Sequence, residues 1–331
     1  MPVLPTEYEK EAVKPSTSSA AIVADALSKS YDGKVVLDAV DVRVAAGTVF
    51  ALLGPNGAGK TTMVNIFATL FEPDAGQVQI AGHDLARDPE GVRSAIGVTG
   101  QFSAVDDLLT GEENLQLIAD LRHLGRDDGR RRVNELLERF ELTDAARRPV
   151  STYSGGMKRR LDLAMTLLGD PQLIFLDEPT TGLDPRSRRE MWDVIGELVS
   201  AGVTIFLTTQ YLDEADRLAD RVAVLDHGQI VAEGRPDELK RRVPGGHISL
   251  HFPDPQTSQS AAHVLGAETA GAESPTLQVP GDGSPASLRA LLSRLDAVGI
   301  EPDRLSIHDA DLDDVFLALT GRPTDQPGPK T

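Results

Sequence analysis

The chain has 331 residues, a formal net charge of −18 and no cysteine. This length predicts about two domains, and the lack of cysteine excludes disulfides and cysteine-ligated zinc. A strongly acidic chain is a poor ligand for nucleic acid, so we expect no nucleic-acid partner. No apolar run reaches the roughly 20 residues that span a bilayer. The first 20 residues lack the apolar segment of a signal peptide. We therefore expect a protein that stays on the side of the membrane where it is made.

The first 20 residues are predicted to be a disordered tail, and the first predicted elements after them are strands. Residues 21–31 and 35–44 are rich in apolar and β-branched side chains, with a turn at Gly33 between them. Tyr31 is the one aromatic residue just upstream of the next motif. From the residues alone, it either stacks on an adenine ring or lies at the edge of a strand.

A glycine-rich turn follows the apolar run Val49 to Leu53 and leads into a helix-like segment, Met63 to Phe71. The turn fits the phosphate-binding pattern G-x-x-x-x-G-K-[ST]. Its glycines let successive N–H groups point at phosphate oxygens, and the helix adds the positive end of its dipole. We expect Lys60 to reach the outer phosphates and the Thr61 hydroxyl to ligate Mg²⁺. The residues predicted to bind a nucleoside triphosphate are Gly54, Pro55, Asn56, Gly57, Ala58, Gly59, Lys60, Thr61 and Thr62.

Further strands are expected at residues 77–81 and 96–99, and helices over residues 108–151. A buried-type strand from Leu173 ends in Asp177 and Glu178, and another, at 203–209, is closed by Gln210. In nucleotide-binding α/β folds the ligand lies at the carboxyl ends of the strands. Asp177 is therefore predicted to hold Mg²⁺ and Glu178 to polarise the attacking water.

A change in composition at residues 240–246 marks the start of a smaller unit. Strands are expected at 247–252, 276–279 and 304–308, and helices at 288–298 and 312–319. This α+β unit contains no recognisable catalytic group. The predicted organisation is a disordered tail at 1–20, a nucleotide-binding domain at 21–239, an α+β accessory domain at 240–320 and a disordered tail at 321–331.

The order of the motifs carries a family resemblance. Ser154-Gly155-Gly156 opens a helical run shortly before the Asp177-Glu178 strand, and Gly182-Leu183-Asp184 comes directly after it. With the phosphate loop and Gln101 upstream, residues 21–239 resemble the ATP-binding-cassette (ABC) ATPases. The resemblance implies a P-loop α/β fold with a RecA-like core, an antiparallel β subdomain and a helical subdomain, followed here by the small α+β unit.

The resemblance also implies roles for single residues. Tyr31 resembles the aromatic residue that stacks on adenine, which favours the first of its two interpretations. Gln101 matches the glutamine that senses Mg²⁺ and γ-phosphate and links to the membrane partner. Ser154, Gly155 and Gly156 match the signature motif, and Asp184 lies in the D-loop. Asp177 and Glu178 match the Walker B aspartate and the catalytic glutamate, so ATP and Mg²⁺ are the implied ligands.

In the family, two cassettes pack head to tail, and each ATP lies between one phosphate loop and the partner's signature. One chain here has one of each, so a homodimer with two identical sites is implied. Tyr153 and Met157 depart from the common signature, but its serine and glycines are present. Gln210 replaces the family's switch histidine. Its amide can donate to γ-phosphate but cannot carry a proton near neutral pH, so we expect it only to position the phosphate.

The resemblance narrows to the daunorubicin-resistance ATP-binding family on four features: Thr99-Gly100-Gln101, Thr152 to Met157, the switch residue Gln210, and Asp313 to Gly321. This implies an exporter ATPase at the cytoplasmic face of the cell membrane, paired with a polytopic permease and driving efflux of a hydrophobic, anthracycline-like compound. The rival interpretations are a non-transport cassette acting on nucleic acid or ribosomes, and a drug-sequestering protein. Residues Val315 to Leu317 either pack within their own unit or communicate with the cassette or the dimer partner.

Overall fold

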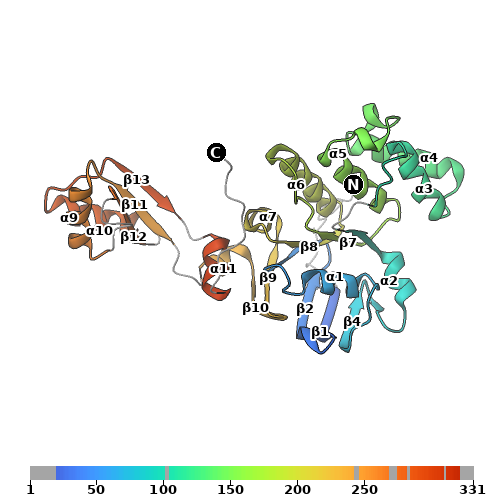
Figure 1. Ribbon diagram of the computed structural model, residues 1–331, viewed down its shortest axis with the longest axis horizontal. Helices are drawn as coiled ribbons and strands as arrows, with labels where there is room; N and C mark the ends of the chain where they lie inside the picture. The colour runs from blue at the N-terminus through green and yellow to red at the C-terminus, as the bar shows by residue number, and fades with distance from the viewer. Residues whose placement is uncertain are drawn as a thin grey trace, which may run out of the picture.

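The computed structural model describes residues 20–100, 104–241, 246–267, 274–281, 284–308 and 311–320. Within these ranges the chain forms three sheets, two in the larger N-terminal part and one in the smaller C-terminal part (Figure 1). Among the described helices, none is both long enough and apolar enough to cross a membrane. The predicted tail residues 1–19 and 321–331 lie outside the described residues.

The central sheet is parallel except for the β9–β10 pair. Its strands, in spatial order, are β10 (Gln229–Gly234), β9 (Arg221–Asp226), β3 (Val49–Leu53), β8 (Thr204–Thr209), β7 (Leu173–Asp177) and β6 (Ile96–Thr99). Every residue of β3, β7 and β8 is buried, as expected for apolar strands covered on both faces. In the register, Leu53 pairs with Thr209, and Asp177 pairs with Thr208. The carboxyl ends of three strands therefore meet at one edge.

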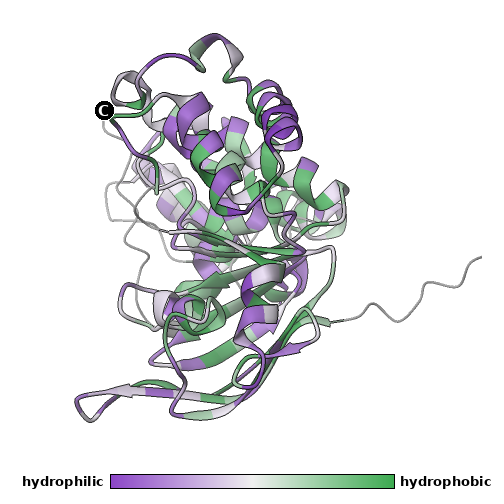
Figure 2. Cartoon of the chain, turned by 90° about the vertical axis from the view of Figure 1, so that its right-hand side faces the viewer, coloured by the Kyte–Doolittle hydropathy of each residue, from purple (hydrophilic) through white to green (hydrophobic). Residues whose placement is uncertain are grey.

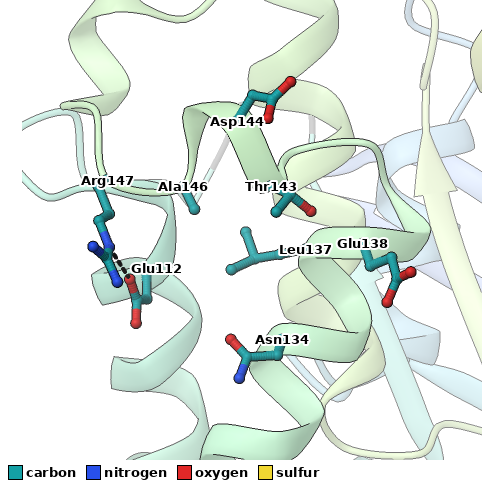
Figure 3. Close-up of a pocket in the computed structure, with 8 residues that line it drawn as sticks. All are labelled: Glu112, Asn134, Leu137, Glu138, Thr143, Asp144, Ala146 and Arg147. Carbon is teal, nitrogen blue, oxygen red and sulfur yellow. Dashed lines mark ion pairs between the residues drawn. The ribbon is translucent and has the colours of Figure 1, made fainter.

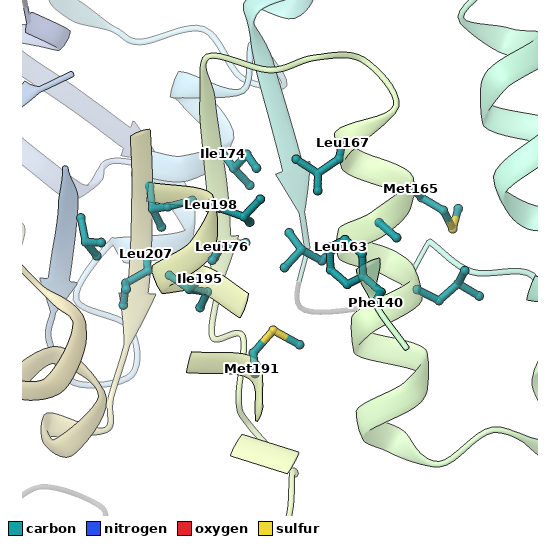
Figure 4. Close-up of a cluster of buried hydrophobic side chains, with 14 of the residues drawn as sticks. Phe140, Leu163, Met165, Leu167, Ile174, Leu176, Met191, Ile195, Leu198 and Leu207 are labelled. Carbon is teal, nitrogen blue, oxygen red and sulfur yellow. The ribbon is translucent and has the colours of Figure 1, made fainter. Parts of the chain in front are cut away.

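Alternate side chains of these strands enter two different cores. On one face, Phe50, Phe175 and Phe206 pack with Phe67 of α1 (Lys60–Phe67), with the Phe50 and Phe206 rings 5.4 Å apart. On the other face, Ile174, Leu176 and Leu207 pack against two helices, as Figure 4 shows. These helices are α5 (Gly155–Leu167) and α6 (Pro185–Ser200).

The antiparallel β subdomain covers the first of these faces and is confirmed as predicted. Its strand order is β2 (Lys34–Ala45), β1 (Ala20–Tyr31), β4 (Ala75–Ile80) and β5 (His83–Asp84). Apolar residues of β1, β2 and β4 join the same core as the phenylalanines. Helix α2 (Pro89–Ala95) connects this sheet to β6. Figure 2 shows that hydrophobic residues gather on the strands and on the helix faces turned toward them.

The helical subdomain contains α3 (Gly111–Leu121), α4 (Arg126–Arg139) and the 3₁₀ turns Thr143–Ala145 and Val150–Thr152. Helix α3 begins with a capping box, in which the Thr110 hydroxyl accepts from Glu113 N at 3.2 Å and Glu113 Oε2 accepts from Thr110 N at 2.8 Å. Leu115, Val133 and Phe140 join the core that contains α5. The helices predicted over residues 108–151 are therefore confirmed.

The C-terminal part is a three-stranded antiparallel sheet with helices beside it. Its elements are β11 (His247–His251), α9 (Pro255–Leu265), β12 (Thr276–Pro280), α10 (Pro285–Asp296) and β13 (Arg304–His308), with the strand order β12-β11-β13. It has a core of its own, built around Leu250, Phe252, Leu277 and Leu295. Helix α9 was not predicted, because its polar sequence buries mainly Ala261, Ala262 and Leu265.

The last helix, α11 (Leu312–Thr320), packs on the N-terminal part and not in the core of the small sheet. It contacts α7 (Leu212–Leu218) and α8 (Pro236–Lys240), and Figure 1 shows it between the small sheet and β10. Val315 and Phe316 are 2% and 4% exposed in the core shared with Leu212 and Leu239. The interpretation that this helix packs only within its own unit is therefore wrong.

Candidate active site

The phosphate loop joins β3 to α1 and depends on glycine at its last position. Gly59 has φ +113°, and a Cβ there would lie 2.8 Å from Leu37 Cδ2 and 2.9 Å from the Val36 carbonyl oxygen. Only glycine fits this close approach and this backbone conformation. The loop therefore keeps its main chain against β2, at the N-terminus of α1, where free N–H groups bind anions.

Lys60 is buried within this loop, with 5% of its surface exposed. Its ammonium donates to the carbonyl oxygens of Gly54 at 2.6 Å and Pro55 at 3.2 Å. Burial lowers the pKa of Lys60, and the nearby Glu178 and Asp177 carboxylates offset part of that shift. The ammonium of Lys60 is thus held by loop carbonyl groups, near enough to both carboxylates for their charges to act on it.

A pocket of about 340 Å³ opens beside the loop. The predicted residues that line it are Tyr31, Asn56, Gly57, Gly59, Lys60, Thr61, Thr62 and Glu178. Tyr31 is 39% exposed and packs edge-on against Phe71, with ring centroids 6.2 Å apart. Gly54, Pro55 and Ala58 belong to the loop but do not line the pocket. Val36 also lines it and was missed, although it stands in an exposed stretch just after the Gly33 turn.

Asp177 links the loop to the central sheet. Its Oδ2 accepts from the Thr61 hydroxyl at 3.3 Å, and its Oδ1 accepts a short hydrogen bond from Thr208. A threonine hydroxyl beside a carboxylate is the oxygen donor set that Mg²⁺ prefers. Thr61 and Asp177 therefore fit the predicted metal site, where bound Mg²⁺ would neutralise phosphate charge.

Glu178 is the first residue after β7 and has the left-handed φ of 50°. Its N–H donates to the Thr208 carbonyl oxygen at 3.0 Å, and its Oε2 accepts from the Thr181 hydroxyl at 3.2 Å. An L-residue with a side chain rarely adopts this conformation. The conformation is held by its neighbours and leaves the carboxylate at the pocket.

Of the two glutamines predicted to act at the nucleotide, the structure describes only one. Gln210 follows β8 at the same sheet edge as Asp177, is half-buried, and is not among the residues that line the pocket. Gln101 lies outside the described residues, while its neighbour Gly100 is described at the end of β6. Both roles stay predictions.

The signature and the D-loop lie side by side in this chain. Ser154 is the N-cap of α5 and accepts from Met157 N at 3.3 Å. Asp184 caps α6 and accepts from Ser187 N at 3.0 Å and from the Ser187 hydroxyl at 2.7 Å. These bonds lower the pKa of Asp184. None of Ser154, Gly155, Gly156 and Asp184 lines the pocket of the same chain, so their nucleotide-binding role stays a prediction.

A larger pocket of about 580 Å³ lies in the helical subdomain, and none of its lining residues belongs to a nucleotide motif. Figure 3 shows its lining residues on α3, α4 and the following turn, with Arg147 paired to Glu112 at 3.7 Å. Its walls carry Glu138 and Asp144 but no element of the phosphate loop. The smaller pocket at Lys60 is therefore the candidate active site.

Comparisons with known proteins agree with this geometry. The ABC transporter family model matches residues 37–181. A daunorubicin resistance ATP-binding protein of Streptomyces coeruleorubidus is 46% identical over 303 residues, which is 91% of this chain and 96% of the relative. A daunorubicin/doxorubicin resistance ATP-binding protein of Streptomyces peucetius is also 46% identical, covering 92% of this chain and 94% of the relative. A Nod factor export ATP-binding protein of Sinorhizobium fredii is 37% identical, covering 93% of this chain and 88% of the relative.

Solved structures agree with this fold over about two thirds of the chain. An ATP-binding subunit of an ABC transporter is similar with a TM-score of 0.61 and 32% identity, covering 67% of this chain and 92% of that structure. A dimeric ATP-binding cassette bound to ADP and Pi has a TM-score of 0.59 and 26% identity, covering 65% of this chain and 98% of that structure. The predicted cassette fold is thus confirmed. The chain belongs to the ABC transporter family, in the group of daunorubicin-resistance ATP-binding subunits, and binds and hydrolyses ATP.

Proposed function

We propose that this chain is the ATPase subunit of an exporter that moves a hydrophobic, drug-like compound through a separate polytopic permease. The observation that carries it is the meeting of Lys60, Thr61 and Glu178 at one pocket, with Asp177 hydrogen-bonded to Thr61 beside it. The relatives of the chain are named for drug resistance and export. The acidic charge of −18 argues against the nucleic-acid alternative. A drug-sequestering protein would have no use for Glu178 at a phosphate loop.

In this proposal Tyr31 stacks on the adenine ring and the loop from Gly54 to Thr62 holds the phosphates. Thr61, Asp177 and Gln101 would hold Mg²⁺, which would neutralise phosphate charge when bound. Glu178 accepts a proton from the attacking water, and Gln210 positions the γ-phosphate. Lys60 stabilises the charge that develops on the phosphate oxygens.

The site is completed by a second copy of the chain. Ser154, Gly155, Gly156 and Asp184 of the partner copy would close over the nucleotide, so a symmetric pair holds two ATP. We propose the organisation 21–239 for the cassette and 240–320 for the accessory unit, with tails at either end. The last helix of the accessory unit, α11, packs on the cassette. Assembly with the permease would place the chain at the cytoplasmic face of the membrane, as a peripheral subunit.

The dimer is tested by gel filtration of Glu178→Gln protein with ATP. This variant should retain ATP and elute as a dimer, because it keeps the binding residues but lacks the proton acceptor. The parent protein with ADP should elute as a monomer, and Glu178→Gln/Lys60→Ala should fail to dimerise. If Glu178→Gln turned over ATP at the parent rate, the role of Glu178 would be wrong.

The transport role is tested by isolating tagged Glu178→Gln protein, held in ATP, from detergent-solubilised membranes of its native cells. We expect a polytopic membrane protein to co-purify in equal amount, and to be lost from the Lys60→Ala control. Recovery of only ribosomal or other soluble partners would overturn the exporter assignment and leave the cassette fold standing.

A further inference from the structure

One arginine side chain connects three of the nucleotide motifs within a single chain. Arg159 lies on α5, just beyond Ser154-Gly155-Gly156, and its side chain is 12% exposed. Its Nη1 donates to the Gly100 carbonyl oxygen at 2.9 Å, its Nη2 to that of Asp177 at 3.1 Å, and its Nε to that of Pro179 at 3.0 Å. The helix that begins at the signature is thus bonded to two loops of the active site.

The three carbonyl groups stand next to residues with proposed roles in hydrolysis. Gly100 immediately precedes Gln101, and Asp177 and Pro179 lie on either side of Glu178. Glu178 has a φ of 50°, which an L-residue adopts only when its surroundings hold it there. The two hydrogen bonds from the Arg159 guanidinium to Asp177 and Pro179 fix the main chain on both sides of Glu178.

The chemistry of the contact requires a guanidinium. Its planar group presents five N–H donors in fixed directions, whereas an ammonium is a compact charge on a flexible stem. The positive charge is balanced by Asp162, whose Oδ2 lies 3.4 Å from Nη1 and whose side chain is 3% exposed. The neighbouring Arg160 does something different, because it pairs with Glu141 of the helical subdomain at 3.2 Å.

We propose that Arg159 is a positioning residue that couples the signature helix to Glu178 and to Gly100, next to the end of β6, in the same chain. This inference rests on the proposed function, in which each signature contacts the ATP bound to the partner copy. When that ATP binds, its contact with the signature fixes the position of α5. The three hydrogen bonds of Arg159 would then fix the main chain on both sides of Glu178, which acts on the ATP bound by its own chain.

The consequence is a link between the two ATP sites of the dimer. ATP at one site engages the signature of the second chain, and Arg159 of that chain then orders the Glu178 that serves the other site. Hydrolysis at the two sites should therefore be cooperative. Removing Arg159 should leave ATP binding intact, since its contacts are to carbonyl groups and not to the pocket.

The test compares Arg159→Gln and Arg159→Lys with Arg160→Gln, which removes a similarly buried guanidinium from the same helix. Hydrogen exchange of the amides in residues 177–182, ATP affinity, and ATPase rate against ATP concentration are measured for each folded protein. In Arg159→Gln we expect faster exchange at 177–182, unchanged ATP affinity, a kcat lower by on the order of 10- to 100-fold, and loss of cooperativity. Arg159→Lys should recover little of this, and Arg160→Gln should resemble the parent.

Parent-like exchange at 177–182 in Arg159→Gln would overturn the inference, and so would equal effects in Arg160→Gln. Because exchange does not require turnover, it decides the role of Arg159 separately from the proposed function. If the parent chain itself failed to hydrolyse ATP, the proposed function would fall, and the exchange comparison would still show whether Arg159 holds the Glu178 segment. Unchanged exchange together with a low kcat would also count against the coupling.

Discussion

Gly156 of the signature lies so close to Ser187 of α6 that a Cβ at Gly156 would be 2.7 Å from the Ser187 Oγ and 2.9 Å from its Cβ. Real Cβ atoms do not come this near to another residue, so the glycine is required by packing within one chain. This contact joins the start of the signature helix to the helix capped by Asp184.

Gly156→Ala should therefore lower both thermal stability and ATPase rate, because the new methyl group forces α5 and α6 apart. The double variant Gly156→Ala/Ser187→Gly removes the clashing side chain. Because Ser187→Gly also removes the hydrogen bond from the Ser187 hydroxyl to Asp184, the double variant is compared with Ser187→Gly alone. We expect its ATPase rate to come within about a factor of two of that single variant, since the two positions are in contact and their effects are not additive.

Gly155→Ala is the matched control for stability, because the nearest atom to its added Cβ is Leu183 Cδ2 at the ordinary distance of 3.7 Å. It should leave the melting temperature unchanged. If Ser187→Gly failed to restore any activity to Gly156→Ala, the glycine would be needed for the partner's nucleotide and not for this internal contact.

The switch position offers a second prediction. Gln210→Ala removes an amide donor at the sheet edge that also carries Asp177, and should lower kcat by on the order of 100-fold, as loss of a donor to a developing charge does. Gln210→His restores a donor that titrates near pH 6.5. We expect this variant to hydrolyse ATP with a pH dependence near that value which the parent lacks. Parent-like kcat in Gln210→Ala would contradict a positioning role.

The phosphate loop and the carboxylates could be predicted because their signals are local. Gly59, Lys60 and Thr61 are contiguous, and Asp177 closes an apolar strand whose end must reach the ligand edge of a parallel sheet. Contacts between residues far apart in the sequence could not be predicted from such local patterns. The carbonyl partners of Arg159 lie 18, 20 and 59 positions away, so the sequence shows only two adjacent arginines after the signature.

The C-terminal helix shows a second limit of sequence reasoning. The sequence predicts a last helix over residues 312–319, and α11 confirms it. The pattern states that one face is buried but does not identify the surface that buries it. Here that surface belongs to α7 and α8 of the cassette, which only the assembled fold reveals.

This contact can be tested with two substitutions on the same helix. Phe316 is 4% exposed, and Phe316→Ala should lower the free energy of unfolding by about 3 kcal/mol through lost burial and a cavity. Leu317 is 48% exposed, and Leu317→Ala should change it by less than about 0.5 kcal/mol. Urea unfolding of both variants makes the comparison. Equal effects of the two substitutions would contradict packing of α11 through the Phe316 face.

A buried carboxyl gives the last prediction. Glu214 of α7 is 0% exposed and its Oε1 accepts from Trp192 Nε1 of α6 at 3.1 Å. Burial raises the pKa of Glu214 above its ordinary value of 4.5, although hydrogen bonds from Thr209 and Trp192 oppose the shift. A raised pKa in the folded state means that folding favours the protonated form. The stability contributed by Glu214 is then complete below about pH 4.5 and lost as pH rises through the folded pKa.

Glu214→Gln keeps an acceptor for Trp192 but has no charge to bury. We therefore expect parent-like stability in acid and a gain in stability above the folded pKa of Glu214, where the parent must bury a charge. Urea unfolding at pH 5 and pH 8 should show the difference growing with pH. Glu197→Gln, an exposed position on α6, is the control and should show no such trend. A difference that shrank as pH rose would mean that Glu214 is stabilised as a carboxylate, because its donors would then outweigh the effect of burial.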